Sequence, residues 1–301
     1  MPICKLPPRL LFHSLILLLS STLLTGCSSL QQEHTVTDRL SPVTENTTHQ
    51  YHPGKFIWHD LLTPDAEAAK KFYGALLGWN FKDLEGYIEI HHNHHLIGGI
   101  LQVTPEKDEK EALATWLPSL SVEDIDAKVQ WVTANGGKTL KGPLDMPQRG
   151  RGALISDPQG ARLVILRTPQ GDPMDRQARM GDWLWNEIWS PTPDQLKVFY
   201  QGLGGYQSTI ETPDYIILVR DGQWRAGIRR VSDDSHPPIW IPVVRVENPE
   251  QLLDQVETLG GVVWVRPGET PDNKDTALIS DNTGALLMLQ RWNYDSNRKE
   301  K

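Results

Sequence analysis

Cysteine is scarce in this sequence of 301 residues, which contains only Cys4 and Cys27. Beyond residue 27 the chain therefore has no disulfide, no cysteine nucleophile and no thiolate ligand for a metal. A folded part without thiols suits an oxidising compartment.

Basic charge is also in short supply, because 30 lysines and arginines stand against 38 aspartates and glutamates, a formal net charge of −8. Phosphate neutralisation supplies most nucleic-acid affinity, so an acidic chain without a basic block is not expected to bind nucleic acid. The sequence lacks the G-x-S-x-G, C-x-x-C, H-E-x-x-H and Walker A motifs. Gly202, Gly204 and Gly205 follow a helical pattern, so they predict a helix end and not a phosphate loop.

The apolar run Leu10–Leu24 is short for a membrane span, which takes about 20 residues. It follows Lys5 and Arg9 and precedes small residues, which is the pattern of a secretory signal. We therefore predict a signal peptide over residues 1–26.

The signal ends in Leu24-Thr25-Gly26-Cys27, which resembles the lipobox of bacterial lipoproteins. The resemblance implies that Cys27 becomes the first residue of the mature protein and carries diacylglycerol and an amide-linked acyl chain, enough for stable anchoring. Ser28 follows, and a residue other than Asp at that place implies an outer-membrane lipoprotein facing the periplasm. An ordinary signal peptide near a cysteine and an uncleaved anchor are the alternatives. Residues 27–53 are polar and aperiodic, so the part after Cys27 is predicted to be a flexible tether.

A segment at residues 58–79 returns at residues 185–206, and each copy predicts a short strand, a turn, an amphipathic helix and a glycine stop. Matched landmarks keep a nearly constant offset of 124 to 128 residues. They are Trp58 and Trp185, Phe72-Tyr73 and Phe199-Tyr200, Tyr87 and Tyr215, Gly99 and Gly227, Trp116 and Trp240, Gly136-Gly137 and Gly260-Gly261, and Asp157 and Asp281.

Each copy contains two units with the order strand, helix and three strands. The chain is therefore predicted to hold two α+β domains, at residues 54–168 and 181–292. A polar linker at 169–180 joins the domains, and a polar tail occupies 293–301.

The repeated body resembles the vicinal oxygen chelate superfamily, which includes glyoxalase I, bleomycin-resistance proteins and extradiol dioxygenases. The resemblance depends on Trp58…Asp65…Phe72-Tyr73…Gly78-Trp79, on Gly98-Gly99 and on the turn Asp157-Pro158-x-Gly160-Ala161. It implies that two βαβββ modules pair in each domain. Their sheets then curl into an open cup that holds a metal or a small ligand, with the helices outside.

The positions that the resemblance assigns to metal ligands hold unsuitable side chains. They are Trp58 and Val164 in the first domain and Trp185 and Met288 in the second, and the matching middle strands carry Trp116-Leu117 and Trp240-Ile241. None of these side chains binds a divalent cation, which requires imidazole or carboxylate groups. We therefore expect neither a standard metal centre nor another cofactor.

Aromatic and acidic residues are predicted to face the cups instead, because strand alternation places Asp60 beside Trp58 and Glu187 beside Trp185. The candidate cup residues are Trp58, Asp60, Tyr87, Trp116, Trp185, Glu187, Tyr215 and Trp240. An acid beside a tryptophan could orient a polar ligand or act as an acid/base. Alternatively, the tryptophan fills the cup as core and the acid pairs with an arginine.

Two further clusters have two interpretations each. His91, His92, His94 and His95 flank a turn and could bind a transition metal, or they could be solvated hairpin residues. Arg149 and Arg151 could meet an anionic ligand or lie on a solvated edge. His59 is expected on the face opposite Trp58, away from the cup.

Three functions remain open from the sequence. The first is a membrane-tethered protein that binds a small organic molecule without a metal. The second is a glyoxalase- or dioxygenase-like enzyme that uses a non-standard metal or the carboxylate of Asp60 or Glu187. The third is a structural lipoprotein with filled cups. The expected partners are the lipid membrane, through the acylated N-terminus, and a small molecule.

Overall fold

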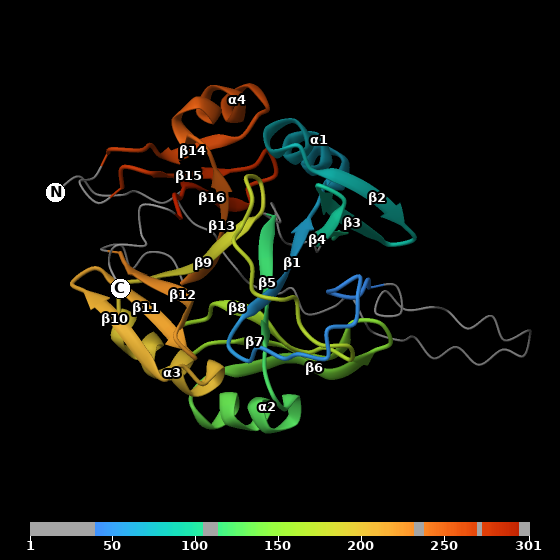
Figure 1. Ribbon diagram of the computed structural model, residues 1–301, viewed down its shortest axis with the longest axis vertical. Coiled ribbons are helices and arrows are strands. Elements are labelled where there is room, and N and C mark those ends of the chain that lie inside the picture. Colours follow the sequence, from blue (N-terminus) through green and yellow to red (C-terminus); the bar gives the residue numbers. More distant parts are fainter. Residues whose placement is uncertain (1–39, 105–113, 232–237, 270–272, 295–301) are drawn as a thin grey trace, which may run out of the picture.

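The computed structural model describes residues 40–104, 114–231, 238–269 and 273–294, so the predicted signal peptide and Cys27 lie outside the described residues. Each half of the body forms one mixed sheet (Figure 1). The first domain contains β1 (Phe56–Thr63), α1 (Ala66–Leu77), β2 (Asn80–Leu84), β3 (Tyr87–His92), β4 (His95–Gln102), β5 (Thr115–Ser121), α2 (Ile125–Ala134), β6 (Lys138–Met146), β7 (Gly150–Ser156) and β8 (Arg162–Arg167).

The second domain repeats this order after the linker. It contains β9 (Trp183–Ser190), α3 (Pro193–Gly204), β10 (Ser208–Thr212), β11 (Tyr215–Arg220), β12 (Gln223–Arg230), β13 (Ile239–Val246), a 3-10 turn η2 (Pro249–Leu252), α4 (Leu253–Thr258), β14 (Val262–Val265), β15 (Thr276–Ser280) and β16 (Leu286–Arg291).

The two sheets have the same topology. Their strand orders are β2-β3-β4-β1-β5-β8-β7-β6 and β10-β11-β12-β9-β13-β16-β15-β14. In each sheet the first strands of the two modules pair antiparallel at the centre, β1 with β5 and β9 with β13. The predicted α+β fold of tandem βαβββ modules is therefore confirmed.

The ends of the first helix follow from local chemistry. Asp65 is the N-cap of α1, and its carboxylate accepts a hydrogen bond from the Ala68 amide at 2.9 Å. Thr63, two residues earlier, is the last residue of β1. Gly78 ends the helix in the left-handed conformation with φ 70°, a backbone geometry that favours glycine.

The helices cover the convex faces of the sheets and meet in pairs between the domains (Figure 1). One buried cluster joins side chains of α1 to those of α4 and the strands beneath it, and a second joins α2 to α3 in the same way. Each of these cores contains residues of both domains. The domains therefore share their apolar cores, and neither buries its helices alone.

Two pseudo-symmetric hydrogen-bond chains cross this shared interface. The Tyr73 hydroxyl donates to Asp281 Oδ2 at 2.9 Å and accepts from Trp116 Nε1 at 3.0 Å. The second chain consists of Tyr200, Asp157 and Trp240, with the corresponding distances 2.8 and 2.9 Å. All six side chains are buried, so the interface carries paired polar groups as well as apolar surface.

The prediction that Trp116 and Trp240 line the cups is wrong. Trp116 lies opposite Leu61 on neighbouring strands, and opposed residues point to the same face of a sheet. That face carries α1 and the shared core, whereas Trp58 and Asp60 point to the other face. Both tryptophans therefore serve the interface between the domains.

Removal of one hydroxyl should test this interface. In Tyr200→Phe, Asp157 Oδ2 and Trp240 Nε1 lose their buried partner, so we expect the free energy of unfolding to fall by about 1–3 kcal/mol. Tyr73→Phe should behave alike. The control is Tyr51→Phe, which keeps its ring against the Arg167 guanidinium and should change stability by less than about 0.5 kcal/mol. Urea unfolding measures all three, and equal losses in Tyr200→Phe and Tyr51→Phe would contradict the assignment.

The same interface should make stability depend on pH. Burial raises the pKa of Asp157 to about 6, although Tyr200 and backbone amides stabilise its charged form. The unfolded value is about 3.9, so between about pH 4 and 6 the folded state binds more protons and this group lowers stability as pH rises. Asp157→Asn removes the titration. The free energy of unfolding of the variant minus that of the wild type should therefore rise by up to about 3 kcal/mol between pH 4 and 6. Urea unfolding across this range provides the test, and a constant difference would contradict it.

Candidate ligand-binding site

The first cup, defined as the concave face of the first sheet around Trp58, Asp60 and Tyr87, surrounds a buried carboxylate. Asp60 Oδ1 accepts hydrogen bonds from Trp58 Nε1 at 2.9 Å and from the Tyr87 hydroxyl at 2.7 Å. Asp60 Oδ2 accepts from Arg149 Nη1 at 3.2 Å, and Arg149 Nη2 donates to the Tyr87 hydroxyl at 2.9 Å. The acid is thus paired with an arginine, the alternative that the sequence left open.

Arg149 is 2% exposed, so the prediction of a solvated edge is wrong for this residue. Its guanidinium lies 4.4 Å from the centroid of the Trp58 ring. Burial opposes its charge, but Tyr87 and Asp60 outweigh burial and raise the pKa of Arg149. Arg151, two residues away, is the solvated member of the pair.

Glycine lets the tyrosine reach the acid in both domains. A Cβ at Gly99 would overlap the Tyr87 hydroxyl, and a Cβ at Gly227 would overlap the Tyr215 hydroxyl. Asp60 is the register partner of Gly99 across β1 and β4. Position 99 of the Gly98-Gly99 motif is therefore a glycine because the Tyr87 hydroxyl lies against its backbone.

The second cup, defined as the concave face around Trp185, Glu187 and Tyr215, has a similar network. Glu187 Oε1 accepts from Trp189 Nε1 at 2.7 Å and from Arg229 Nε at 2.5 Å. Glu187 Oε2 accepts from the Tyr215 hydroxyl at 2.7 Å and from Arg229 Nη2 at 3.3 Å. Tyr215 in turn accepts from Trp185 Nε1 at 2.8 Å, which places all five side chains in one network.

The two cups obtain their arginine from different elements, a loop in the first domain and a strand in the second. At the repeat offset of 128, Arg229 of β12 corresponds to Leu101 of β4. At the offset of 124, Arg149 corresponds to Asn273. The buried acid has kept an arginine partner in both copies, while the source of that partner has changed.

A cavity of about 910 Å³ adjoins the second cup, where it meets the linker and the start of the first domain. This volume is within the range of small-molecule sites. Glu187 and Arg229 lie among the polar residues that line it. Its aromatic lining residues are Trp183, Trp185, Tyr215, Trp224, Trp292 and Tyr294.

The linker forms part of the lining and is tied to both domains. Asp175 makes ion pairs with Lys55 at 2.9 Å and with Arg225 at 2.7 Å. Burial opposes the charge of Asp175, but hydrogen bonds from Arg225 and Lys55 hold its pKa well below the ordinary value.

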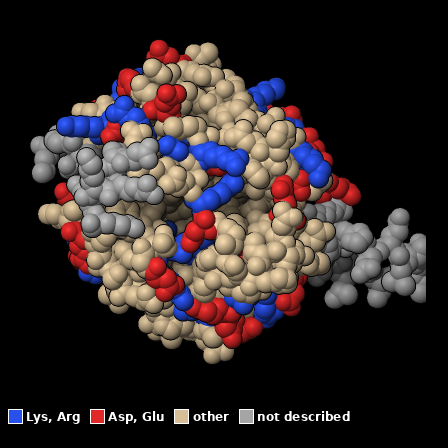
Figure 2. Space-filling model, in the orientation of Figure 1, with Lys and Arg blue, Asp and Glu red and all other residues tan. Residues whose placement is uncertain are grey.

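On the face shown in Figure 2, acidic and basic side chains are interspersed.

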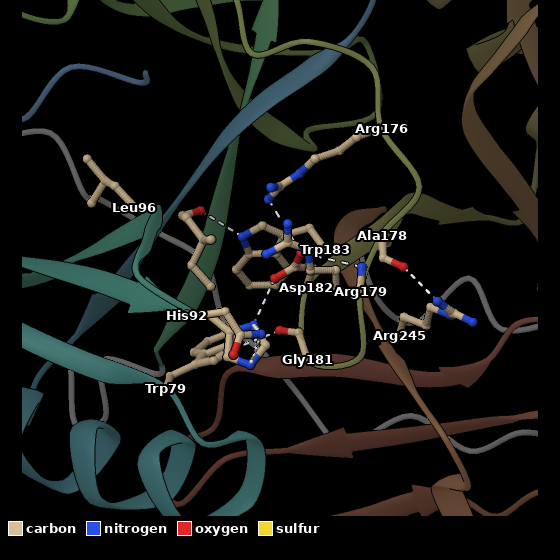
Figure 3. A network of polar contacts seen from close by, with 12 residues as sticks. Trp79, His92, Leu96, Arg176, Ala178, Arg179, Gly181, Asp182, Trp183 and Arg245 are labelled. Carbon is tan, nitrogen blue, oxygen red and sulfur yellow. Dashed lines mark hydrogen bonds and ion pairs between the residues drawn. The ribbon is translucent and has the colours of Figure 1, made fainter. Parts of the chain in front are cut away.

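The end of the linker joins the first domain through the contacts drawn in Figure 3. His92 Nδ1 lies 2.8 Å from Asp182 Oδ1, and Trp79 Nε1 donates to the Gly181 carbonyl at 2.8 Å. Trp183 Nε1 donates to the Ile97 carbonyl at 2.7 Å. Since His92 is buried in this contact, it is not a solvated hairpin residue.

The histidines around the hairpin turn do not come together in one site. His91 Nε2 contacts Glu89 at 3.0 Å, whereas His92 reaches the second domain. Over the ranges that the structure describes, no three His, Cys, Asp or Glu side chains lie close enough to hold a metal ion. His59 lies at the domain interface, where Nε2 is 2.8 Å from Asn186 Oδ1, and burial lowers its pKa to about 4.

The positions that the resemblance assigns to metal ligands do converge on the cups. Trp58 and Val164 pack in one apolar cluster, and Trp185 and Met288 pack in another. Since indole, alkyl and thioether groups are not ligands for a divalent cation of this superfamily, the side chains do not fit its metal centre.

Comparison with known proteins agrees with this architecture. Residues 55–165 match the family described as the Glyoxalase/Bleomycin resistance protein/Dioxygenase superfamily. The Mn(II)-bound glyoxalase of Novosphingobium aromaticivorans superimposes with a TM-score of 0.55 at 15% identity, covering 80% of this chain and 82% of that one. The first domain therefore matches the model of this superfamily, and the second domain repeats the same sheet topology.

Two further proteins are similar to most of this chain. CFP32 of Mycobacterium tuberculosis, which is named as a candidate glyoxylase, is 28% identical over 256 residues, or 80% of this chain and 95% of CFP32. The anthracycline biosynthesis protein DnrV of Streptomyces peucetius is 23% identical over 266 residues, or 80% of this chain and 94% of DnrV.

Six of the candidates contact one another in two hydrogen-bonded groups, namely Trp58, Asp60 and Tyr87 in the first domain and Trp185, Glu187 and Tyr215 in the second. Their role toward a ligand stays a prediction. Sequence reasoning allowed for an arginine partner of each acid without identifying which arginine, and it missed the linker as a lining segment. A buried acid requires a cationic partner, so the two acids were a signal that an arginine was needed, but not of which one.

Neighbouring arginines provide a test of the first cup. Arg149→Met leaves the buried Asp60 carboxylate without its cation, so we expect the free energy of unfolding to fall by about 3–5 kcal/mol. Arg151→Met removes exposed pairs with Asp126 and Asp145 and should have an effect below about 1 kcal/mol. Urea unfolding of both variants distinguishes them. Similar losses in the two would show that Arg149 does not neutralise Asp60.

Proposed function

We propose that this protein binds a planar aromatic molecule in the cavity beside its second cup, and that it does so without the superfamily's metal centre. The observation that carries the proposal is the cavity of about 910 Å³ with its lining of tryptophans and tyrosines. Aromatic rings offer large apolar contact areas and stacking partners for a flat ligand. The name of DnrV, an anthracycline biosynthesis protein, connects one relative with small-molecule metabolism.

The charged groups at this cavity suit recognition better than catalysis. Both oxygens of Glu187 already accept two hydrogen bonds each, so a substrate would have to displace a donor before the carboxylate could take its proton. Asp60 is similarly engaged in the first cup. An arginine, a tyrosine hydroxyl and an indole N–H fixed around one acid offer a ligand preorganised polar partners.

We further propose that the protein acts as a lipoprotein, anchored through Cys27 to the bacterial outer membrane and facing the periplasm. The lipobox resemblance and the absence of cysteine after residue 27 support this location. Across the described ranges, no helix has the length and apolar character of a membrane span.

Ligand binding can be measured directly. Protein extracted from membranes is examined by mass spectrometry for bound compounds, and the released protein is titrated with a naphthol by calorimetry. We expect binding of one equivalent. Trp224 lines the cavity and is 49% exposed, so Trp224→Ala should weaken affinity about tenfold through lost stacking without unfolding the protein.

The matched control is Ile210→Ala, an apolar residue of similar exposure on β10 that does not line this cavity. It should leave affinity unchanged. If no aromatic compound binds or co-purifies, or if the two variants bind equally well, the proposed function is wrong.

A further inference from the structure

The first cup already contains a peptide. The docking segment, which we define as residues 40–45, belongs to the region expected to be a flexible tether, yet it lies against the first domain. Val43 is 5% exposed and packs in one cluster with Trp58, Tyr87 and Leu166. Its side chain therefore takes up apolar surface that a small ligand of this cup would cover.

Polar groups of the cup hold the same segment. The Ser41 hydroxyl donates to Glu89 Oε1 at 2.6 Å, and the Ser41 carbonyl accepts from Arg149 Nε at 2.5 Å. Ser41 is 3% exposed, so both interactions are shielded from water. Arg149 thus joins the buried acid of the cup to the backbone of the docking segment.

The chain between this segment and β1 is also fastened. The amides of Thr48 and His49 donate to the Gln170 carbonyl at 3.0 Å each, and the His52 amide donates to Asp172 Oδ2 at 2.7 Å. The linker therefore holds the path from the docking segment into the first domain.

The groups that hold Ser41 are particular to the first copy. At the repeat offsets, Glu89 corresponds to Ile217 and Arg149 corresponds to Asn273. At these two positions the second domain therefore has neither the carboxylate that accepts from the Ser41 hydroxyl nor the guanidinium that donates to its carbonyl, and the acid of the second cup pairs with Arg229 instead. The two cups have diverged toward different occupants.

We propose that the first cup is the docking site of the chain's own residues 40–45 and sets how far the body extends from its lipid anchor. The consequence for the anchor rests on the proposed lipidation of Cys27. From Cys27 to residue 40 the chain has 13 residue steps and reaches at most about 45 Å. Without docking, the 21 steps to Thr48, the next residue that the linker holds, would reach about 70 Å. Docking thus shortens the reach by about a third and leaves the second cup as the open one.

Thiol accessibility tests the docking in the full chain. The thiol introduced by Val43→Cys is alkylated in native protein, and the rate at this site is read by peptide mass spectrometry. The comparison is Val198→Cys on α3, where the native side chain is 66% exposed. We expect alkylation at position 43 to be at least about 100-fold slower, because reaction requires release of the segment.

A second variant weakens the docking by giving position 89 the isoleucine that the second domain has at the equivalent position. Adding Glu89→Ile to Val43→Cys removes the acceptor of Ser41, so alkylation at position 43 should accelerate about tenfold while the rate at position 198 stays unchanged. Equal rates at 43 and 198 in otherwise native protein, or no effect of Glu89→Ile, would overturn the proposal. Val43 also lines the cavity, but both readouts are taken without ligand and measure only release of the segment, so failure here is distinct from failure of the proposed function.

Discussion

Each domain buries one carboxylate at the bottom of its cup, and a buried carboxylate requires a cation beside it. Arg149 meets this requirement in the first domain and Arg229 in the second. Because each arginine forms an ion pair with the acid of its cup, the charge of that acid is balanced within the protein. The neighbouring tryptophans complete a site whose chemistry is hydrogen bonding and stacking.

The choice of arginine also separates the two cups. Arg149 comes from the loop before β7 and has a further N–H available, which binds the carbonyl of Ser41. Arg229 comes from β12 and uses Nε and Nη2 on Glu187. The first cup thereby closes over a segment of its own chain, whereas the second opens on a cavity lined by the linker. The shared helical cores join the two domains, and the cavity lies at their junction.

Much of the fold could be predicted from the sequence, because duplication leaves landmarks at constant offsets. Glycine stops and the Asp157 turn recur since each repeats a local backbone requirement. The Phe-Tyr pairs recur because both copies pack them in the shared cores. Strand alternation correctly grouped Trp58 with Asp60. It failed for Trp116 and Trp240, because alternation defines two faces of a strand without saying which one the helices cover.

The remaining parts depend on contacts between residues distant in sequence. Arg149 lies 89 residues from Asp60, and no local pattern indicates that pairing. Ser41 and Val43 occur in a polar, aperiodic stretch, where burial comes from the cup and not from the stretch itself. The cavity combines β9, β12, the linker and the first domain, so its size follows only from how these segments pack together.

The central claim is that one cup is filled by the chain and the other holds one small molecule. Native mass spectrometry of the full chain, titrated with a naphthol in detergent micelles, measures this most directly. The account predicts a single mass increment of one ligand per chain. It also predicts that no second increment forms at saturation, because residues 40–45 occupy the first cup. Two equivalent increments, or none, would contradict it.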